Sequence, residues 1–192
     1  YRVGDGANWS EWFQFKTLQA GPAPLRFIYF GDAQNDLKAH WSRVVRGAFS
    51  DMPKADFVLH AGDLVNVGSA DAEWGEWFAA AGWINGMVPS VPTPGNHEYV
   101  GNKKPKTTAF PGSAEKEPAD DDKPPPAEVK AKPPGRLTTH WRAVFTLPEN
   151  GPPGLEETAY YLDVQGVRLV SLNSNEKQAE QVPWLERVLA EN

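Results

Sequence analysis

The amino-acid sequence predicts an α/β fold in which helices connect the strands of a parallel sheet. Three β-rich runs, at 25–30, 56–59 and 87–91, each lead to a glycine and then to a residue with a side-chain oxygen, and each is expected to form a buried strand. Apolar residues at helical spacing lie between these runs, at 37–52 and 74–84. This alternation is that of βαβ units, so the carboxyl ends of the three strands should meet at one edge of the sheet.

The first 20 residues are expected to stand apart from this pattern. Residues 1–4 and 9–17 should pair as a β-hairpin, because the Gly-Asp-Gly-Ala-Asn between them has the chemistry of a turn. The segment 1–20 resembles the last hairpin and linker of a fibronectin-type or immunoglobulin-like β-sandwich, and 21–192 is then a second domain. The alternative is that the hairpin caps the main domain.

Both predicted helices have recognisable ends. The first should begin with Asn35 or Asp36 as its N-cap, and the second near Ser69 or Asp71, with its end between 82 and 86. The apolar stripe of the second helix is expected to be core, with a sugar-binding platform as the alternative, and consists of Trp74, Trp77, Phe78, Ala81 and Ile84.

The second half of the chain begins with a segment of different composition. Residues 102–136 are rich in Lys, Pro, Asp and Glu without apolar periodicity, which predicts a mobile surface insertion, or alternatively a lid over the site. A hairpin is expected from 158–164 and 167–172, turned at Gln165-Gly166. A further helix should begin at Pro183, since proline suits the first helical turn.

Composition limits the classes of function. The net charge of −6 disfavours a nonspecific nucleic-acid footprint, because few cations are available to neutralise phosphates. With no cysteine, a metal would have to be held by oxygen or histidine ligands. No apolar stretch approaches the roughly 20 residues of a membrane span, so we expect no membrane partner.

The three strand ends predict a metal site. Asp32, Asp63 and Asn96 would be delivered to one sheet edge, and two carboxylates with a carboxamide suit hard or borderline divalent cations. With two cations about 4 Å apart, Asp63 from the middle strand is the natural bridge, with Asp32 on one metal and Asn96 on the other. His97 would then donate a hydrogen bond or a proton to a phosphate ester, and Glu98 could orient its imidazole.

These motifs resemble those of the calcineurin-like metallophosphoesterase superfamily, in particular its purple-acid-phosphatase-related branch with an N-terminal fibronectin-type domain. The resemblance rests on Gly31-Asp32, Gly62-Asp63 and the tetrad Gly95-Asn96-His97-Glu98, in that order. It implies a metallophosphoesterase β-sandwich flanked by helices, and hydrolysis of small phosphate esters in the manner of an acid phosphatase. It also implies two metal ions, Fe, Mn or Zn, with a metal-bound hydroxide as nucleophile, and a secreted or periplasmic location.

The chain also departs from the family pattern. Where the family commonly has a metal-binding His or Tyr, this sequence has Gln34, which we expect to be a weak oxygen ligand, and Asn66. The later His ligands of the family do not occur, so we expect a longer enzyme whose remaining chain completes the site, and weak metal binding by these 192 residues alone. The alternatives are a catalytically silent binding or scaffold protein on the same fold, and a carbohydrate- or surface-binding module built around the Trp-rich first hairpin.

Overall fold

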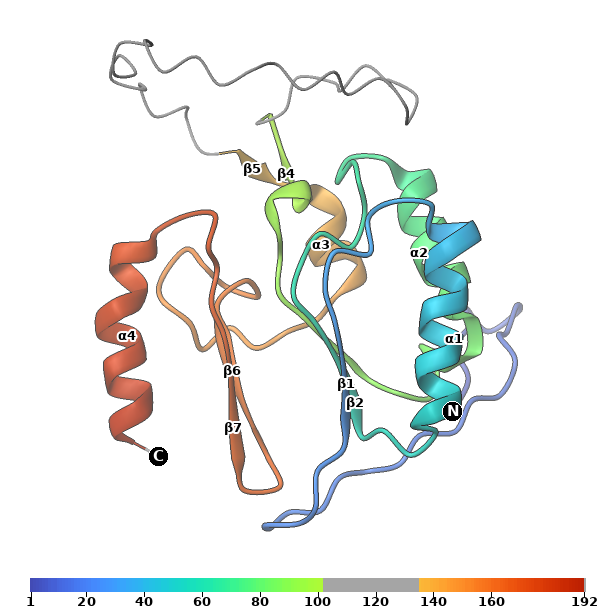
Figure 1. Ribbon diagram of the computed structural model, residues 1–192, viewed down its shortest axis with the longest axis horizontal. Coiled ribbons are helices and arrows are strands. Elements are labelled where there is room, and N and C mark those ends of the chain that lie inside the picture. The colour runs from blue at the N-terminus through green and yellow to red at the C-terminus, as the bar shows by residue number, and fades with distance from the viewer. Residues whose placement is uncertain (102–134, 192) are drawn as a thin grey trace, which may run out of the picture.

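The computed structural model describes residues 1–101 and 135–191, and its centre is a three-stranded sheet (Figure 1). The strands are β1 (Phe27–Phe30), β2 (Phe57–His60) and β3 (Ser90–Pro92). All pairs are parallel and the order is β1-β2-β3, so β2 is the middle strand. The α/β class, the parallel arrangement and the central place of the second strand are confirmed.

Helices cover one face of this sheet. They are η1 (Leu37–Trp41), α1 (Ser42–Asp51), α2 (Asp71–Ala81) and the short η2 (Gly82–Ile84). Trp41, Trp74 and Trp77 are almost fully buried at the centre of the resulting core. The prediction that the tryptophan stripe is core is therefore confirmed.

A second layer lies on the other side of the sheet. The strands β6 (Tyr160–Val164) and β7 (Val167–Ser171) form the predicted antiparallel hairpin, and α4 (Gln178–Ala190) lies beyond it (Figure 1). The hydroxyl of Tyr160 joins the layers by donating to the carbonyl oxygen of Pro92, at 2.7 Å. The remaining elements are η3 (Asn96–Glu98), β4 (Tyr99–Val100), β5 (Arg136–Leu137) and α3 (Thr139–Val144).

The predicted start of the last helix is wrong. Helix α4 begins at Gln178, so Pro183 lies inside it rather than in its first turn. The first turn is held by Gln181, whose amide oxygen accepts from the N–H of Asn173 and whose amide nitrogen donates to the carbonyl of the same residue. These tertiary hydrogen bonds extend the helix upstream of the proline, where local sequence preference gives no signal.

Two further expectations need correction. Strand β1 is not a buried strand, since Phe27 and Tyr29 on its second face are 42% and 65% exposed. The expected pairing at 1–17 is present but irregular: backbone hydrogen bonds join Ser10 to Val3 and Phe13 to Tyr1, and the bridge between Gly4 and Trp9 closes the turn without two regular strands.

The predicted insertion at 102–136 lies outside the described residues except at its end, where Arg136 belongs to β5. None of the helices in the described ranges has the length and apolar character needed to cross a membrane.

Candidate metal centre

The loops that follow β1, β2 and β3 meet at one edge of the sheet. The N–H of Asp32 donates to the carbonyl of Gly62 at 3.3 Å, and the N–H of Gln34 donates to the carbonyl of Asp63 at 3.0 Å. The N–H of His97 donates to Oδ1 of Asp63 at 2.8 Å, which joins the second and third loops. The predicted convergence of the three strand ends is therefore present in the backbone.

Asp32 and Asp63 both have left-handed backbones, with φ of 58° and 52°. This conformation costs a residue other than glycine roughly 1 kcal/mol or more, and it persists only where the surroundings enforce it. Both residues directly follow a strand and its glycine, so the conformation turns the chain sharply at the sheet edge. Strain of this kind is common at functional sites.

Two glycines allow the second and third loops to approach each other closely. Gly62 has a φ of +90°, and a Cβ there would overlap the backbone of Gly95. A Cβ at Gly95 would in turn overlap the backbone nitrogen and the carboxylate of Asp63. Glycine precedes the two oxygen-bearing residues because there is no room for a side chain.

Glu98 holds these loops together from beneath. Its side chain is fully buried, and its carboxylate accepts four backbone hydrogen bonds, from Asp63 at 2.9 Å, Leu64 at 2.8 Å, Val65 at 3.4 Å and Gly95 at 2.7 Å. Burial raises the pKa of Glu98, whereas the hydrogen bonds act in the opposite direction. The expectation that Glu98 orients the imidazole of His97 is not met, because both its oxygens are directed at backbone N–H groups.

His97 is oriented by the backbone instead. With its proton on Nδ1, the ring donates to the carbonyl oxygen of Asn66. This contact fixes the orientation of the imidazole ring and requires a proton on Nδ1, since a carbonyl oxygen can only accept. The side chain is partly exposed, as a group that reaches a substrate must be.

Gln34 and Asp32 form a pair of oxygen donors on the first loop. The amide nitrogen of Gln34 donates a hydrogen bond to Oδ1 of Asp32. The amide oxygen of Gln34 is buried and has no hydrogen-bond partner within the described residues. An orphaned buried oxygen is costly unless something else satisfies it, and a cation would do so. Asp32 and Asn96 are exposed at the same edge.

The donor chemistry of this edge fits a hard cation. Asp32 and Asp63 offer carboxylates, and Gln34 and Asn96 offer amide oxygens, a set that suits Mg²⁺, Mn²⁺ or Fe better than soft metals. In the described ranges, no three His, Asp or Glu side chains lie close enough together to hold a metal ion. The fit therefore rests on mixed carboxylate and amide donors.

The remaining histidines have other surroundings. His60 is buried among the rings of Phe30, Trp41 and Trp77, and burial lowers its pKa to about 4. His40 is exposed on η1, and Nε2 of His140 lies 3.4 Å from a carboxylate oxygen of Asp71. His60 is thus a packed core residue, although its Nδ1 has no hydrogen-bond partner in the described part of the chain.

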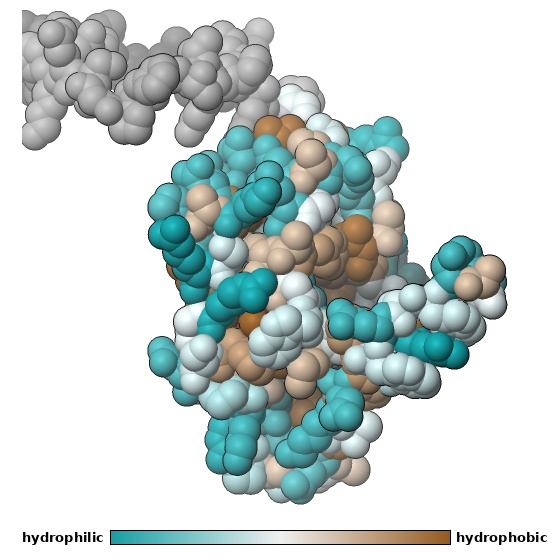
Figure 2. Space-filling view, turned by 90° about the vertical axis from the view of Figure 1, so that its right-hand side faces the viewer, coloured by the Kyte–Doolittle hydropathy of each residue, from teal (hydrophilic) through white to brown (hydrophobic). Residues whose placement is uncertain are grey.

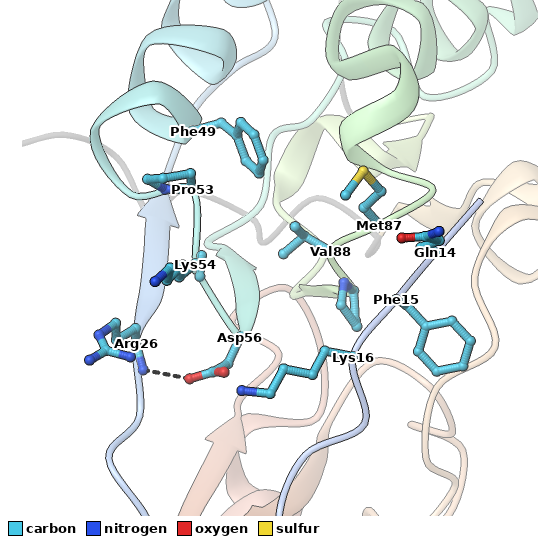
Figure 3. Close-up of a pocket in the computed structure, with 12 residues that line it drawn as sticks. Gln14, Phe15, Lys16, Arg26, Phe49, Pro53, Lys54, Asp56, Met87 and Val88 are labelled. Carbon is cyan, nitrogen blue, oxygen red and sulfur yellow. Dashed lines mark hydrogen bonds between the residues drawn. The ribbon is translucent and has the colours of Figure 1, made fainter.

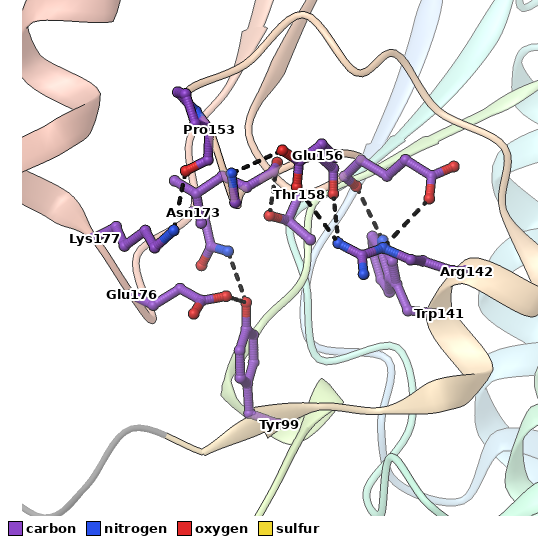
Figure 4. Close-up of polar contacts among 12 residues, drawn as sticks. Tyr99, Trp141, Arg142, Pro153, Glu156, Thr158, Asn173, Glu176 and Lys177 are labelled. Carbon is purple, nitrogen blue, oxygen red and sulfur yellow. Dashed lines mark hydrogen bonds and ion pairs between the residues drawn. The ribbon is translucent and has the colours of Figure 1, made fainter.

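Sequence reasoning missed the loop after β7. The amide of Asn175 donates to the carbonyl of Pro94 at 3.1 Å, directly before the third loop, and its backbone N–H donates to the side chain of Asn173. Figure 4 shows Asn173 and Glu176 both in contact with the hydroxyl of Tyr99, which donates to Glu176 and accepts from the amide of Asn173. The same sequence signal was present here, because Asn173-Ser174-Asn175 also places side-chain oxygens just after the end of a strand.

Known proteins resemble this chain in family and in fold. The family model described as calcineurin-like phosphoesterase matches residues 25–190. A curated relative from Arabidopsis thaliana, "Probable inactive purple acid phosphatase 1", is 28% identical over 116 residues, covering 52% of this chain and 18% of that protein.

A solved structure gives the corresponding likeness in fold. Purple acid phosphatase PPD1 isolated from yellow lupin (Lupinus luteus) seeds matches with a TM-score of 0.63 at 20% identity, covering 96% of this chain and 31% of that one. The chain thus spans less than a third of the length of either protein.

Proposed function

The chain belongs to the calcineurin-like phosphoesterase family, and from this premise we propose that it forms part of a metal-dependent phosphoesterase that hydrolyses small phosphate esters in the manner of an acid phosphatase. The observation that carries the proposal is the meeting of three oxygen-bearing loops at the carboxyl edge of the sheet, where α/β proteins bind their ligands. We further propose a secreted or periplasmic location.

Asp32, Asp63, Asn96 and Gln34 would hold the metal, proposed to be two ions of Fe, Mn or Zn. When bound, such ions neutralise charge on a phosphate and make water nucleophilic near neutral pH. The role of this chain is to position the oxygen atoms that would bind the metal. Glu98 and the two glycines hold the second and third loops together, and the N–H of His97 restricts the carboxylate of Asp63.

His97 would act on the leaving group. The hydrogen bond from Nδ1 to the Asn66 carbonyl orients the ring, and Nε2 would then be the nitrogen that exchanges a proton with an oxygen of the substrate. A protonated Nε2 beside the site would stabilise a phosphate oxygen or protonate the departing alcohol.

Reconstitution tests this proposal. The longest natural form of the protein is stripped with a chelator, reloaded separately with Mn²⁺, Zn²⁺ or Fe, and assayed for release of p-nitrophenol from p-nitrophenyl phosphate. Asp63→Asn should lower kcat by about 100-fold or more, since it removes one of the two carboxylates that would hold the metal. Asp36→Asn is the matched control, because Asp36 also has a positive φ, of 50°, but is exposed and lies outside the donor set. Equal loss in both variants would contradict the assignment.

A second candidate is a phosphoesterase fold without catalysis. It is favoured by the name of the Arabidopsis relative, which describes that protein as inactive, and by Gln34 and Asn66 at positions where the family commonly has stronger ligands. Absence of phosphate release with every metal, in protein that still binds the metal by calorimetry, would favour this candidate over the first.

A further inference from the structure

A cavity lies at the end of the sheet opposite the candidate metal centre. It has a volume of about 510 Å³, within the range of small-molecule sites. Its walls include Arg26, Asp56 and Pro89, which directly precede β1, β2 and β3, whereas the metal-centre loops follow these strands. We call it the amino-end cavity; Figure 3 shows its lining.

The amino-end cavity gathers positive charge in an acidic protein. Lys16, Arg26 and Lys54 line it, and among the described residues only Asp56 adds a carboxylate, although the whole chain has a net charge of −6. Oδ2 of Asp56 accepts the backbone N–H of Arg26 at 2.8 Å, and the N–H of Asp56 donates to the carbonyl of Arg26 at 2.7 Å. Within the described residues, no ion pair neutralises any of the three cations.

Apolar and aromatic groups form the rest of the wall. In Figure 3, Phe49 lies above the charged residues, and Phe15 and Met87 lie to their right. Phe15 and Met87 are 59% and 38% exposed, so apolar surface is available to a ligand at the rim. Phe49 is held in place by an edge-to-face contact with Trp83, with ring centroids 5.0 Å apart. On the face seen in Figure 2, hydrophobic side chains emerge only in patches between hydrophilic ones.

We propose that the amino-end cavity binds a small organic anion that combines an aromatic ring with a phosphate group, of the size of a nucleoside monophosphate. The three cations would bind the phosphate, and the rings of Phe15 and Phe49 would contact the aromatic part. A dianion also relieves the mutual repulsion of the cations. The site is separate from the metal centre and does not depend on the proposed function.

Calorimetric titration with three probes tests the proposal, using 5′-AMP, adenosine and inorganic phosphate in the presence of EDTA. AMP should bind at least about tenfold more tightly than either of the others, because it alone contacts both the apolar wall and the cations. Added salt should weaken the binding of AMP and not that of adenosine, since only the phosphate contact is ionic. AMP binding no tighter than that of adenosine or of phosphate would overturn the proposal.

Variants locate the binding. Lys16→Gln and Lys54→Gln should each weaken AMP binding by about two- to fivefold, the range for an exposed ion pair, with the losses multiplying in the double variant. Arg187→Gln, an exposed cation on α4, removes the same charge far from the cavity and should leave the affinity unchanged. Far-UV circular dichroism and thermal midpoints would establish that all variants fold equally.

The outcome is distinguishable from that at the metal centre. Asp63→Asn should abolish phosphatase activity under the proposed function while leaving AMP affinity in EDTA unchanged. AMP binding that is lost in Asp63→Asn but kept in the Lys16→Gln/Lys54→Gln double variant would locate the anion at the metal centre and refute the inference. An AMP affinity that falls as much in Arg187→Gln as in the Lys16→Gln and Lys54→Gln variants would also refute the inference.

Discussion

Replacement of Glu98 by Gln should destabilise the fold strongly while leaving the side-chain shape almost unchanged. Each oxygen of Glu98 accepts two backbone hydrogen bonds. Glutamine keeps one oxygen and puts an NH₂ donor where the other was, so two buried N–H groups lose their acceptor. At about 1–3 kcal/mol for each unsatisfied donor, and with some relief from burying a neutral group, the loss should be about 2–4 kcal/mol.

The loss is measured by urea denaturation at neutral pH, followed by tryptophan fluorescence. For a domain of this size it corresponds to a fall in thermal midpoint of about 5–15 °C. The matched control is Glu73→Gln: Glu73 accepts a single backbone hydrogen bond, from Val67 at 2.7 Å, which a glutamine oxygen can keep. Its loss should stay below about 1 kcal/mol.

The comparison has a clear refutation. A Glu98→Gln protein within about 1 kcal/mol of the parent would mean that the four hydrogen bonds do not hold the loops together, and the account of the tetrad would have to be abandoned. Large and equal losses in both variants would refute it as well, because the effect would not depend on the number of donors.

Three other changes have definite expected outcomes. Burial lowers the pKa of His60 from 6.5 to about 4, so between these pH values the unfolded chain binds a proton that the folded chain does not. The free energy of unfolding should therefore fall by about 3 kcal/mol as the pH drops from 6.5 to 4. Urea titrations of His60→Leu should lack this part of the pH dependence. Gly95→Ala should cost about 2 kcal/mol or more in denaturation experiments and reduce metal-dependent activity, because the new Cβ displaces Asp63. Gly75→Ala should raise stability by about 0.5–1 kcal/mol, because it lies inside α2 with open space at its Cβ, and an unchanged or lower thermal midpoint would contradict this.

The arrangement of the sheet could be predicted because its signals are local. Short β-rich runs separated by amphipathic helices leave few topologies, and the right-handed βαβ connection puts the strand ends together. Burial of β1 could not be predicted in this way, since the exposure of Phe27 and Tyr29 depends on which layer covers that face. The start of α4 depends likewise on the hydrogen bonds between Gln181 and Asn173, two residues whose contact no periodicity indicates.

At the candidate site, the residue types were easier to predict than their roles. Asp32, Asp63 and Asn96 lie on adjoining loops because their positions follow from the strand ends. The role of Glu98 depends on donors 33 to 35 residues earlier in the chain as well as on Gly95, and only the folded backbone reveals it. A carboxylate next to a histidine in sequence suggests that the two interact, but here adjacent side chains point to different partners.

This difference bears on what the Gly-Asn-His-Glu tetrad means. Gly95 and Glu98 serve the packing of two loops, and the N–H of His97 serves the same packing through Asp63. A protein that had lost catalysis would still need these contacts to fold, so the tetrad is stronger evidence for the fold than for activity. Under the proposed function, activity depends instead on the side chains placed at the metal edge: the amide of Gln34, the side chain of Asn96 and the imidazole of His97. Substitutions at those three positions, rather than at Glu98, separate a working phosphoesterase from a silent relative.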